Sequence, residues 1–185
     1  MIRTPRLVIR RFTPGDLADF LAYQSDPIVR RHMQGAPMTS EQAIRYLKEQ
    51  AARGDVSLDS WHGFAVQHVE QDRMIGDIGV YLDAKQAGTG DVGFQFRPDQ
   101  HRLGYGYEAM VGFFPYLFLY LGLDAVTASC DRANAASFGL MERLGMSRTV
   151  DGPTLQYRLN RAEWAGAHRT RSPTDTGRRA QRPSP

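Results

Sequence analysis

A short glycine-bearing segment, His101–Tyr107, contains the residue types that most directly suggest chemistry. Gly104 and Gly106 have no Cβ, so a phosphate can approach the backbone closely there. A helix that begins after such a loop offers unpaired amides and a favourable dipole to an anion, and Arg102 adds a positive charge. Taken by itself, this loop leaves two interpretations open, a phosphate site and a tight turn between a strand and a helix.

Two common phosphate motifs do not fit this segment. No Gly-Lys-Ser/Thr sequence follows, as a P-loop requires, and Ala109 stands where the dinucleotide fingerprint G-x-G-x-x-G has its third glycine. If the loop binds a phosphate, it therefore does so in another structural setting.

The flanking residues predict that setting. Residues 91–97 alternate, with Val92, Phe94 and Phe96 on one face of a strand. A long apolar helix over 105–121 and a strand over 124–130 follow, and Pro115 predicts a kink within the helix. A strand, a helix and a strand in this order form a β-α-β unit whose two strands run parallel with a right-handed crossover.

The rest of the chain predicts more strands and helices around this unit. We expect a helix over 39–54 to bury a stripe of Ile44, Leu47 and Ala51. We also expect helices beginning at Thr13, at Ser25 and at Asn134, and strands over 7–12, 61–69, 74–82, 146–150 and 154–160.

Composition and length indicate one domain of ordinary globular type, with 42% hydrophobic and 23% charged residues in 185. Cys130 is the single cysteine, which excludes an internal disulfide and a cysteine-rich zinc site. The longest apolar run, 110–123, is too short to span a bilayer, and residues 1–12 lack the apolar core of a signal peptide. We therefore expect a cytoplasmic protein with no membrane partner.

The basic character of the chain lies at its C-terminal end. Residues 168–185 contain five arginines and one aspartate, a net charge of +4 against +3 for the whole chain, so the preceding residues are close to neutral. We expect a globular domain over 1–165 and a disordered Arg/Pro-rich tail over 166–185, because the tail has few large apolar residues to bury. The near-neutral body argues against a nucleic-acid binder, and this charge pattern would confine any nucleic-acid contact to the tail.

Three motifs in order give the chain a specific resemblance. Residues 97–109 look like the acyl-CoA loop Q/R-x-x-G-x-G/A of GNAT enzymes. Residues 134–137 and 141–146 resemble the N-x-x-S…E-K-L-G-M/F motif of the ribosomal-protein N-acetyltransferase subgroup, and residues 4–10 with Asp16 and 26–27 match the start of that subgroup. The resemblance spans about residues 3–160. It implies an α+β GNAT fold, with a mixed, mostly antiparallel sheet of six to seven strands, splayed at one parallel pair and flanked by about five helices.

The resemblance also implies how acetyl-CoA is held. Backbone groups of Phe94, Gln95 and Phe96 would hold the acetyl carbonyl and the pantetheine arm between the splayed strands, and Asn134 would hydrogen-bond the pantetheine. The pyrophosphate would bind the amides of Arg102, Leu103, Gly104, Tyr105, Gly106 and Tyr107. His101 departs from the usual Gln/Arg, which backbone binding tolerates.

The catalytic residues are less clear, because Met141 stands where many relatives have a tyrosine acid and Ser129 where some have a glutamate base. The resemblance makes Ser137 the candidate that stabilises the leaving thiolate, although it could equally be an early-helix hydroxyl. Asp91 is the candidate base, acting through water, with a plain strand-start aspartate as the alternative. Asp131, Glu108 and His62 are weaker candidates for the base.

The resemblance therefore implies an N-acetyltransferase. Its partners would be acetyl-CoA and a primary amine, either a protein N-terminus or a small molecule, joined by direct attack in a ternary complex without a metal. A homodimer remains open. The alternative is an acyl-CoA-binding regulatory module with weak catalysis. Residues 26–38, the 83–90 loop and the C-terminal hairpin would form the acceptor pocket, but none of them carries a readable specificity code.

Overall fold

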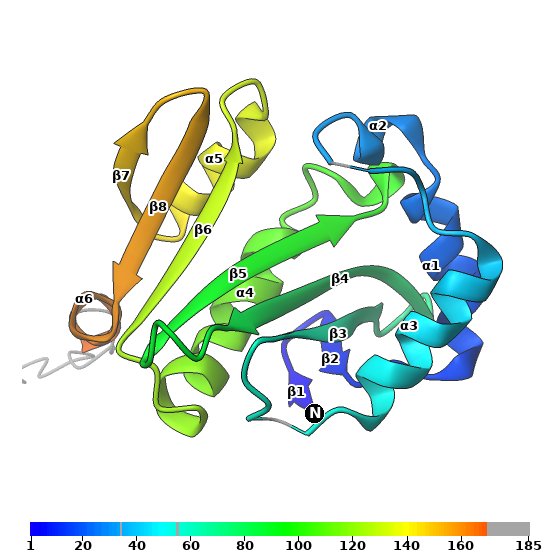
Figure 1. The fold of residues 1–185 in the computed structure, drawn as a ribbon, viewed down its shortest axis with the longest axis horizontal. Coiled ribbons are helices and arrows are strands. Elements are labelled where there is room, and N and C mark those ends of the chain that lie inside the picture. The colour runs from blue at the N-terminus through cyan, green and yellow to red at the C-terminus, as the bar shows by residue number, and fades with distance from the viewer. Residues whose placement is uncertain (34, 55, 170–185) are drawn as a thin grey trace, which may run out of the picture.

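The computed structural model describes residues 1–33, 35–54 and 56–169, and these residues form eight strands and six α-helices (Figure 1). The strands are β1 (Ile2–Arg3), β2 (Leu7–Arg10), β3 (Ser60–His68), β4 (Arg73–Leu82), β5 (Thr89–Phe96), β6 (Ala125–Asp131), β7 (Ser147–Asp151) and β8 (Thr154–Asn160). The helices are α1 (Leu17–Gln24), α2 (Pro27–Arg30), α3 (Ser40–Ala52), α4 (Tyr105–Pro115), α5 (Ala135–Arg143) and α6 (Arg161–Arg169).

All eight strands belong to one sheet in the order β1-β2-β3-β4-β5-β6-β8-β7. Every neighbouring pair is antiparallel except β5 and β6, which run parallel. The parallel pairing joins only Thr89–Asp91 to Ala125–Thr127, and beyond it the two strands diverge into the V visible in Figure 1. The expected splayed α+β fold is thus confirmed, with eight strands rather than six to seven.

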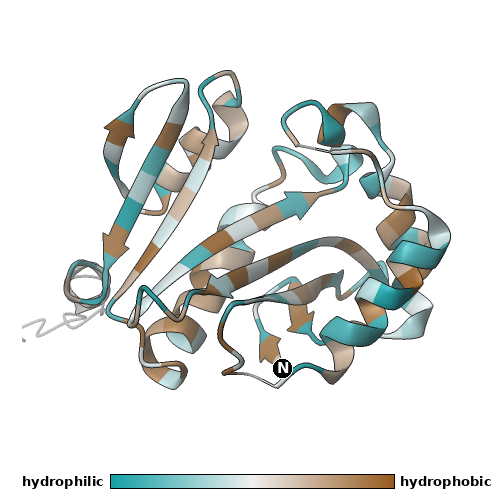
Figure 2. Cartoon of the chain, in the orientation of Figure 1, coloured by the Kyte–Doolittle hydropathy of each residue, from teal (hydrophilic) through white to brown (hydrophobic). Residues whose placement is uncertain are grey.

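The two faces of the sheet bury different hydrophobic clusters. Successive side chains of β3 point to opposite faces and so belong to different clusters. Phe64 and Val66 belong to the large core under α4, whereas Ala65 between them packs with Phe20 and Leu47 beneath α1 and α3. We call these the α4 face and the α1 face. Figure 2 shows the same alternation of hydrophobic and paler residues along β5.

The buried side of α3 differs from the stripe that the sequence predicts. Ala43, Leu47 and Gln50 are buried, whereas Ile44 is 52% exposed and Ala51 is exposed. Gln50 is tolerated inside because its Oε1 accepts a hydrogen bond of 2.7 Å from the Gly63 amide of β3. An apolar pattern alone could not identify this polar contact between α3 and the sheet.

The long helix after the glycine loop changes type at Pro115. The α-helix ends there, and a π-helical turn (Tyr116–Tyr120) follows, in which the Leu121 amide donates to the Tyr116 carbonyl at 2.9 Å. Proline has no amide to donate, so a change in the hydrogen-bond ladder is expected at this point.

A C-terminal helix crosses the domain boundary that the sequence predicts. Helix α6 begins at Arg161 and includes residues 166–169, so the boundary predicted at 165 falls inside a helix. Trp164 anchors α6, since it is 8% exposed and its ring lies 5.1 Å from that of Phe118. The rest of the predicted tail, residues 170–185, lies outside the described residues. None of the described helices is long and apolar enough to cross a membrane.

Candidate active site

The divergence of β5 from β6 opens the middle of the sheet. β4 pairs with β5 along its length, from Gly90 to Phe96, so that side of β5 is fully occupied. On the side toward β6, strand pairing ends at Asp91, and no other described strand pairs with the edge from Val92 to Phe96. This edge, which contains the predicted residues Phe94, Gln95 and Phe96, therefore offers backbone donors and acceptors to a bound molecule.

The segment between β5 and α4 is a compact turn. Pro98–Gln100 form a 3-10 turn, and the His101 side chain lies 2.8 Å from the Phe96 carbonyl through Nε2. Arg102 has φ 61° and Gly104 has φ 84°, both in the left-handed region, and Gly104 is the N-cap of α4. The chain thus turns sharply into α4 so that its first-turn amides, those of Tyr105, Gly106 and Tyr107, point out of the helix end.

The two glycines of the loop have different structural roles. A Cβ on Gly104 would meet only the Arg6 guanidinium at 3.5 Å, so backbone conformation explains this glycine. A Cβ on Gly106 would meet Leu140 of α5 at 3.0 Å and Phe96 of β5 at 3.4 Å. Gly106 therefore allows α4, α5 and β5 to pack closely, a role that the sequence of the loop does not predict.

The N-terminal segment holds this loop in place through Glu108. The Glu108 carboxylate accepts hydrogen bonds from the Thr4 hydroxyl at 2.7 Å, the Arg6 amide at 2.8 Å and the Arg6 guanidinium at 2.6 Å. Arg6 also donates to the Leu103 carbonyl at 3.1 Å. Burial alone would raise the pKa of Glu108, but these hydrogen bonds and the charge of Arg6 lower it. A carboxylate held in this way is a structural anchor rather than a general base.

Asn134 and Ser137 lie together at the start of α5. The Asn134 side chain is the N-cap and accepts from the Ser137 amide at 3.2 Å. The Ser137 hydroxyl lies beside the Cys130 thiol of β6, and burial raises the pKa of that thiol despite this contact. Met141 is 2% exposed within the core, so the position where many relatives have a tyrosine cannot supply an acid here.

Asp91 lies at the base of the V on the other face of the sheet. Its carboxylate accepts a hydrogen bond of 3.0 Å from Thr127, its partner across the parallel pair. The protein around the carboxylate raises its pKa by desolvation, and the Thr127 bond offsets only part of this effect. A carboxylate with a raised pKa is a better proton acceptor than a free one.

A polar cavity of about 420 Å³ adjoins Asp91. Its walls come from the 83–89 loop, from both strands of the parallel pair and from the C-terminal hairpin, which brings together two of the three segments expected to form the acceptor pocket. The lining side chains include two carboxylates and no lysine or arginine; they are Tyr81, Asp83, Gln86, Thr89, Asp91, Thr127, Ala128, Ser129, Thr149, Gln156 and Tyr157. The cavity is within the size range of small-molecule sites.

Ser137 and Asp91 are not in contact. Thr127 lies beside Asp91 on the α1 face, whereas Cys130, which touches Ser137, lies against the core on the α4 face. The three-residue step between them along β6 corresponds to about 10 Å of strand. The two candidates therefore approach the V from opposite faces of the sheet.

The weaker base candidates have structural roles. His62 is 0% exposed and its Nε2 lies 2.7 Å from the Ser57 carbonyl. Asp131 is exposed and accepts from the Ala133 amide at 2.6 Å in the turn before α5. Neither lines the cavity beside Asp91.

A buried pair that the sequence analysis missed lies on the α1 face above Asp91. Asp77 of β4 is 4% exposed and accepts a hydrogen bond of 2.5 Å from the Tyr23 hydroxyl of α1. Burial raises the pKa of Asp77 to about 7, although the Tyr23 bond acts in the opposite direction. The only available signal was an aspartate inside an apolar strand.

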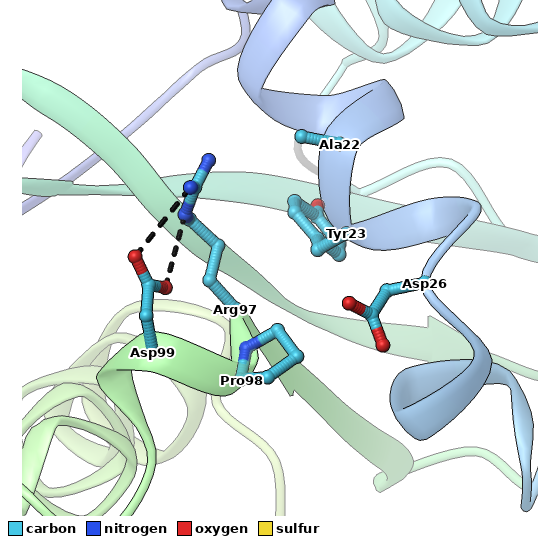
Figure 3. Close-up of a pocket in the computed structure, with 6 residues that line it drawn as sticks. All are labelled: Ala22, Tyr23, Asp26, Arg97, Pro98 and Asp99. Atoms are coloured by element: carbon cyan, nitrogen blue, oxygen red, sulfur yellow. Dashed lines mark hydrogen bonds and ion pairs between the residues drawn. The ribbon is translucent and has the colours of Figure 1, made fainter.

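A smaller cavity of about 280 Å³ lies between α1 and the segment after β5. Figure 3 shows Tyr23 and Asp26 on one side of it, and Arg97 and Pro98 on the other. Arg97 forms ion pairs of 3.2 Å with Asp19 and with Asp99. These contacts tie the beginning of the glycine loop to α1.

Comparison with known proteins identifies the family. Residues 6–147 match the family described as the Acetyltransferase (GNAT) domain, and the chain belongs to this family. It is 30% identical over 147 residues to YnaD of Bacillus subtilis, an uncharacterized N-acetyltransferase, covering 80% of this chain and 82% of YnaD. The family and this relative support N-acetyltransferase activity in general terms.

Two solved structures share the fold. The Vibrio cholerae spermidine N-acetyltransferase, solved in complex with CoA and spermine, superposes with a TM-score of 0.72 at 14% identity, covering 88% of this chain and 99% of that one. A Vibrio cholerae protein provisionally described as a ribosomal-protein-serine acetyltransferase gives a TM-score of 0.73 at 18% identity, covering 86% of this chain and 96% of that one.

Within the described residues, no group of three or more histidine, cysteine, aspartate or glutamate side chains is placed to hold a metal ion.

Proposed function

We propose that this protein transfers the acetyl group of acetyl-CoA to a primary amine by direct attack in a ternary complex. The observation that carries this proposal is the V between β5 and β6, which has a candidate cofactor surface on one face and a candidate acceptor cavity on the other. On the α4 face lie the first turn of α4 and the start of α5. On the α1 face lie Asp91 and the polar cavity.

The chain is suited to bind acetyl-CoA on the α4 face. The left-handed residues Arg102 and Gly104 expose the first-turn amides of α4, where a pyrophosphate would be stabilised by those amides and by the helix dipole. The free edge of β5 from Val92 to Phe96 would hydrogen-bond the pantetheine arm and the acetyl carbonyl. Asn134 would contribute through the part of its side chain that does not cap α5.

Acetyl-CoA supplies an acyl thioester, and the chain positions the groups that move protons around it. Asp91 accepts a proton from the acceptor ammonium through water, and the neutral amine then attacks the thioester carbonyl with its lone pair to form the new C–N bond. An amide of β5 donates to the carbonyl oxygen as negative charge develops there. The Ser137 hydroxyl donates a hydrogen bond to the sulfur as the C–S bond breaks, and the thiolate leaves and takes up the proton that the amine nitrogen loses, to give CoA.

The acceptor is a primary amine of a class that the family does not specify. The spermidine acetyltransferase that shares the fold acts on a small polyamine, and the resemblance in the sequence motifs points to a protein N-terminus as the acceptor. Either class presents a primary amine on a flexible chain, which fits an open V beside a polar cavity.

The test is release of free thiol from acetyl-CoA with a panel of polyamines, aminoglycosides and short peptides with free N-termini. We expect turnover with at least one amine and an upward shift of the melting temperature with acetyl-CoA alone. A thermal shift without turnover on any amine would favour an acyl-CoA-binding regulatory module instead. The absence of both effects would refute the cofactor assignment as well.

A further inference from the structure

Three glycines lie side by side on the α1 face, next to the point where β5 and β6 separate. Gly63 of β3 pairs with Gly79 of β4, and Gly79 pairs with Gly93 of β5. In the row below, Trp61, Tyr81 and Asp91 are paired in the same way, and Asp91 is paired with Thr127 across the parallel strands. Paired residues project from the same face of a sheet, so the three glycines form a shallow trough directly above Asp91.

The Trp61 indole fills this trough. A Cβ built on Gly79 would lie 2.5 Å from the indole Cζ2, and one built on Gly93 would lie 2.9 Å from Cη2. The ring therefore lies across β4 and reaches over β5, the strand whose other edge faces the V. Any side chain in place of these glycines would displace the ring, so the trough and the indole form one unit.

The indole is half-buried, and neighbouring side chains hold it in this position from one side. Its Nε1 and the Tyr46 hydroxyl both lie above Gly63, 3.2 Å and 2.9 Å from a Cβ built there, and Tyr46 is itself stacked on Phe20 at 5.5 Å between the ring centroids. Helix α1 covers the next row of paired residues, where the Tyr23 hydroxyl donates to Asp77 and the Gln24 side chain donates to Gln95. The ring edge over Gly93 thus lies between the α1 wall and the Asp91 carboxylate.

We propose that Trp61 is an acceptor-specificity residue, and that the acceptor it selects is a linear alkylamine with a second positive charge. This inference rests on the proposed acetyltransferase function. An amine that approaches the V from the α1 face passes over the indole, which attracts ammonium groups and alkyl chains through its π face. The remainder of the chain extends into the cavity, where Asp83 and Asp91 are carboxylates and no lining residue is basic.

The kinetic test compares Trp61→Ala with the wild type, using 1,4-diaminobutane and 4-aminobutanoate as acceptors. These amines have the same carbon chain but opposite charge at the far end. We expect the wild type to prefer the diamine at least 10-fold in kcat/KM. We expect Trp61→Ala to raise KM for the diamine about 10-fold, with kcat and the KM for acetyl-CoA changed less than 3-fold. Gly93→Ala, which displaces the ring without removing it, should shift the same KM in the same direction.

A spectroscopic test uses the fact that Trp61 and Trp164 are the two tryptophans of the chain. In Trp164→Phe, emission arises from Trp61 alone, and titration with 1,4-diaminobutane should change it, whereas 4-aminobutanoate should not. The matched Trp61→Phe protein, in which Trp164 reports from beside Phe118, should not respond.

The outcomes separate the inference from the function on which it rests. Wild-type kinetics in Trp61→Ala, an unresponsive Trp164→Phe protein, or equal use of the two acceptors would overturn the inference while leaving an active acetyltransferase. No turnover by the wild type on the whole amine panel would refute the proposed function, and the inference with it. Melting curves of each variant establish that the fold is retained.

Discussion

The two faces of the V are built in different ways. On the α4 face, the candidate cofactor site consists mainly of backbone: the free edge of β5, the turn through Arg102 and Gly104, and the first amides of α4. On the α1 face, the candidate acceptor site consists of side chains that project from β3, β4, β5 and β6, together with those of α1. A cofactor that is common to a family can be bound by a fixed backbone shape, whereas an acceptor that differs between members is selected by side chains that can change without altering the fold.

The largest expected effect comes from the backbone of the α4 face. Gly104→Val places a β-branched residue at φ 84°, which costs about 1–3 kcal/mol of strain or forces the turn to change. We expect acetyl-CoA affinity to fall more than 10-fold and the thermal shift caused by acetyl-CoA to disappear. Differential scanning fluorimetry with and without acetyl-CoA measures both.

Gly122→Val is the matched control for this prediction. Gly122 has φ 71°, and a Cβ there would meet nothing within 4 Å, so the variant introduces similar strain away from the site. It should lower the melting temperature but retain the shift with acetyl-CoA. Retention of the full shift by Gly104→Val would show that the loop does not bind the cofactor.

On the α1 face, Asp91→Asn tests the candidate base. General-base catalysis contributes about 10²–10⁴-fold, and for a proton that passes through water we expect a loss of about 100-fold in kcat with acetyl-CoA binding unchanged. Because the pKa of Asp91 is raised above 3.8, the wild-type rate should rise with pH through that pKa, and this limb should vanish in the variant.

Asp131→Asn provides the control for Asp91, since it changes an exposed carboxylate of β6 that lies outside the candidate site and keeps the oxygen that accepts from Ala133. It should retain the wild-type rate and pH profile. If Asp91→Asn also retains the pH limb, another group accepts the proton.

Ser137→Ala tests the link between the two faces with a smaller effect. Loss of one hydrogen bond to a developing thiolate in a half-buried position should reduce kcat about 10-fold, while acetyl-CoA affinity changes less than 2-fold. Steady-state kinetics separates the two parameters, and Ser147→Ala on the exposed strand β7 is the control. Equal kcat in Ser137→Ala would leave the serine as a first-turn residue of α5 with a contact to Cys130.

The same difference between the faces explains how far the sequence could be interpreted. The β5–loop–α4 segment and the start of α5 are local, so spacing and turn residues predicted the β-α-β unit, the helix start suited to an anion and a helix from Asn134. The splay of β5 from β6 was expected only from the family resemblance. The α1 face depends on the register between strands whose paired residues are 10 to 30 positions apart, such as Trp61, Tyr81 and Asp91. No local pattern predicts that three glycines align, or that an indole lies across them.

The errors in the sequence analysis have the same physical origin. Gln50 is buried because of one hydrogen bond to Gly63, and the Asp77–Tyr23 pair depends on contact between α1 and β4. Helix α6 was missed because its single large anchor, Trp164, packs against a residue more than forty positions earlier. Burial decided by a distant partner cannot be inferred from hydrophobic periodicity.

The smallest effect on catalysis is expected at Asp77, where the α1 face becomes structural. Its pKa is raised from 3.8 to about 7, so the folded state holds a proton that the unfolded state has released between these values. Stability is therefore highest at low pH in this window, falls as pH rises from about 4 to 7, and is constant above. Asp77→Asn keeps an oxygen for the Tyr23 hydroxyl and removes the titration. At pH 8 the variant should be more stable by about 2 kcal/mol, or roughly 6 °C, because the weaker Tyr23 bond to an amide offsets part of the gain.

Asp16→Asn should behave in the opposite way. Burial alone would raise the pKa of Asp16, but hydrogen bonds and charge from Arg10 lower it, so Asp16 stabilises the fold above its unfolded pKa and loses this contribution as pH falls. Melting curves at pH 5 and pH 8 should therefore show that the gain in Asp77→Asn grows with pH, whereas Asp16→Asn is destabilised to the same extent at both, because both pH values lie above the unfolded pKa of 3.8 and its deficit shrinks only below that value. Acetyl-CoA binding should be retained in both variants. If the rate of Asp77→Asn instead falls as far as that of Asp91→Asn, then Asp77 also contributes to catalysis. The catalytic part of the α1 face would then include the row of paired residues that contacts α1.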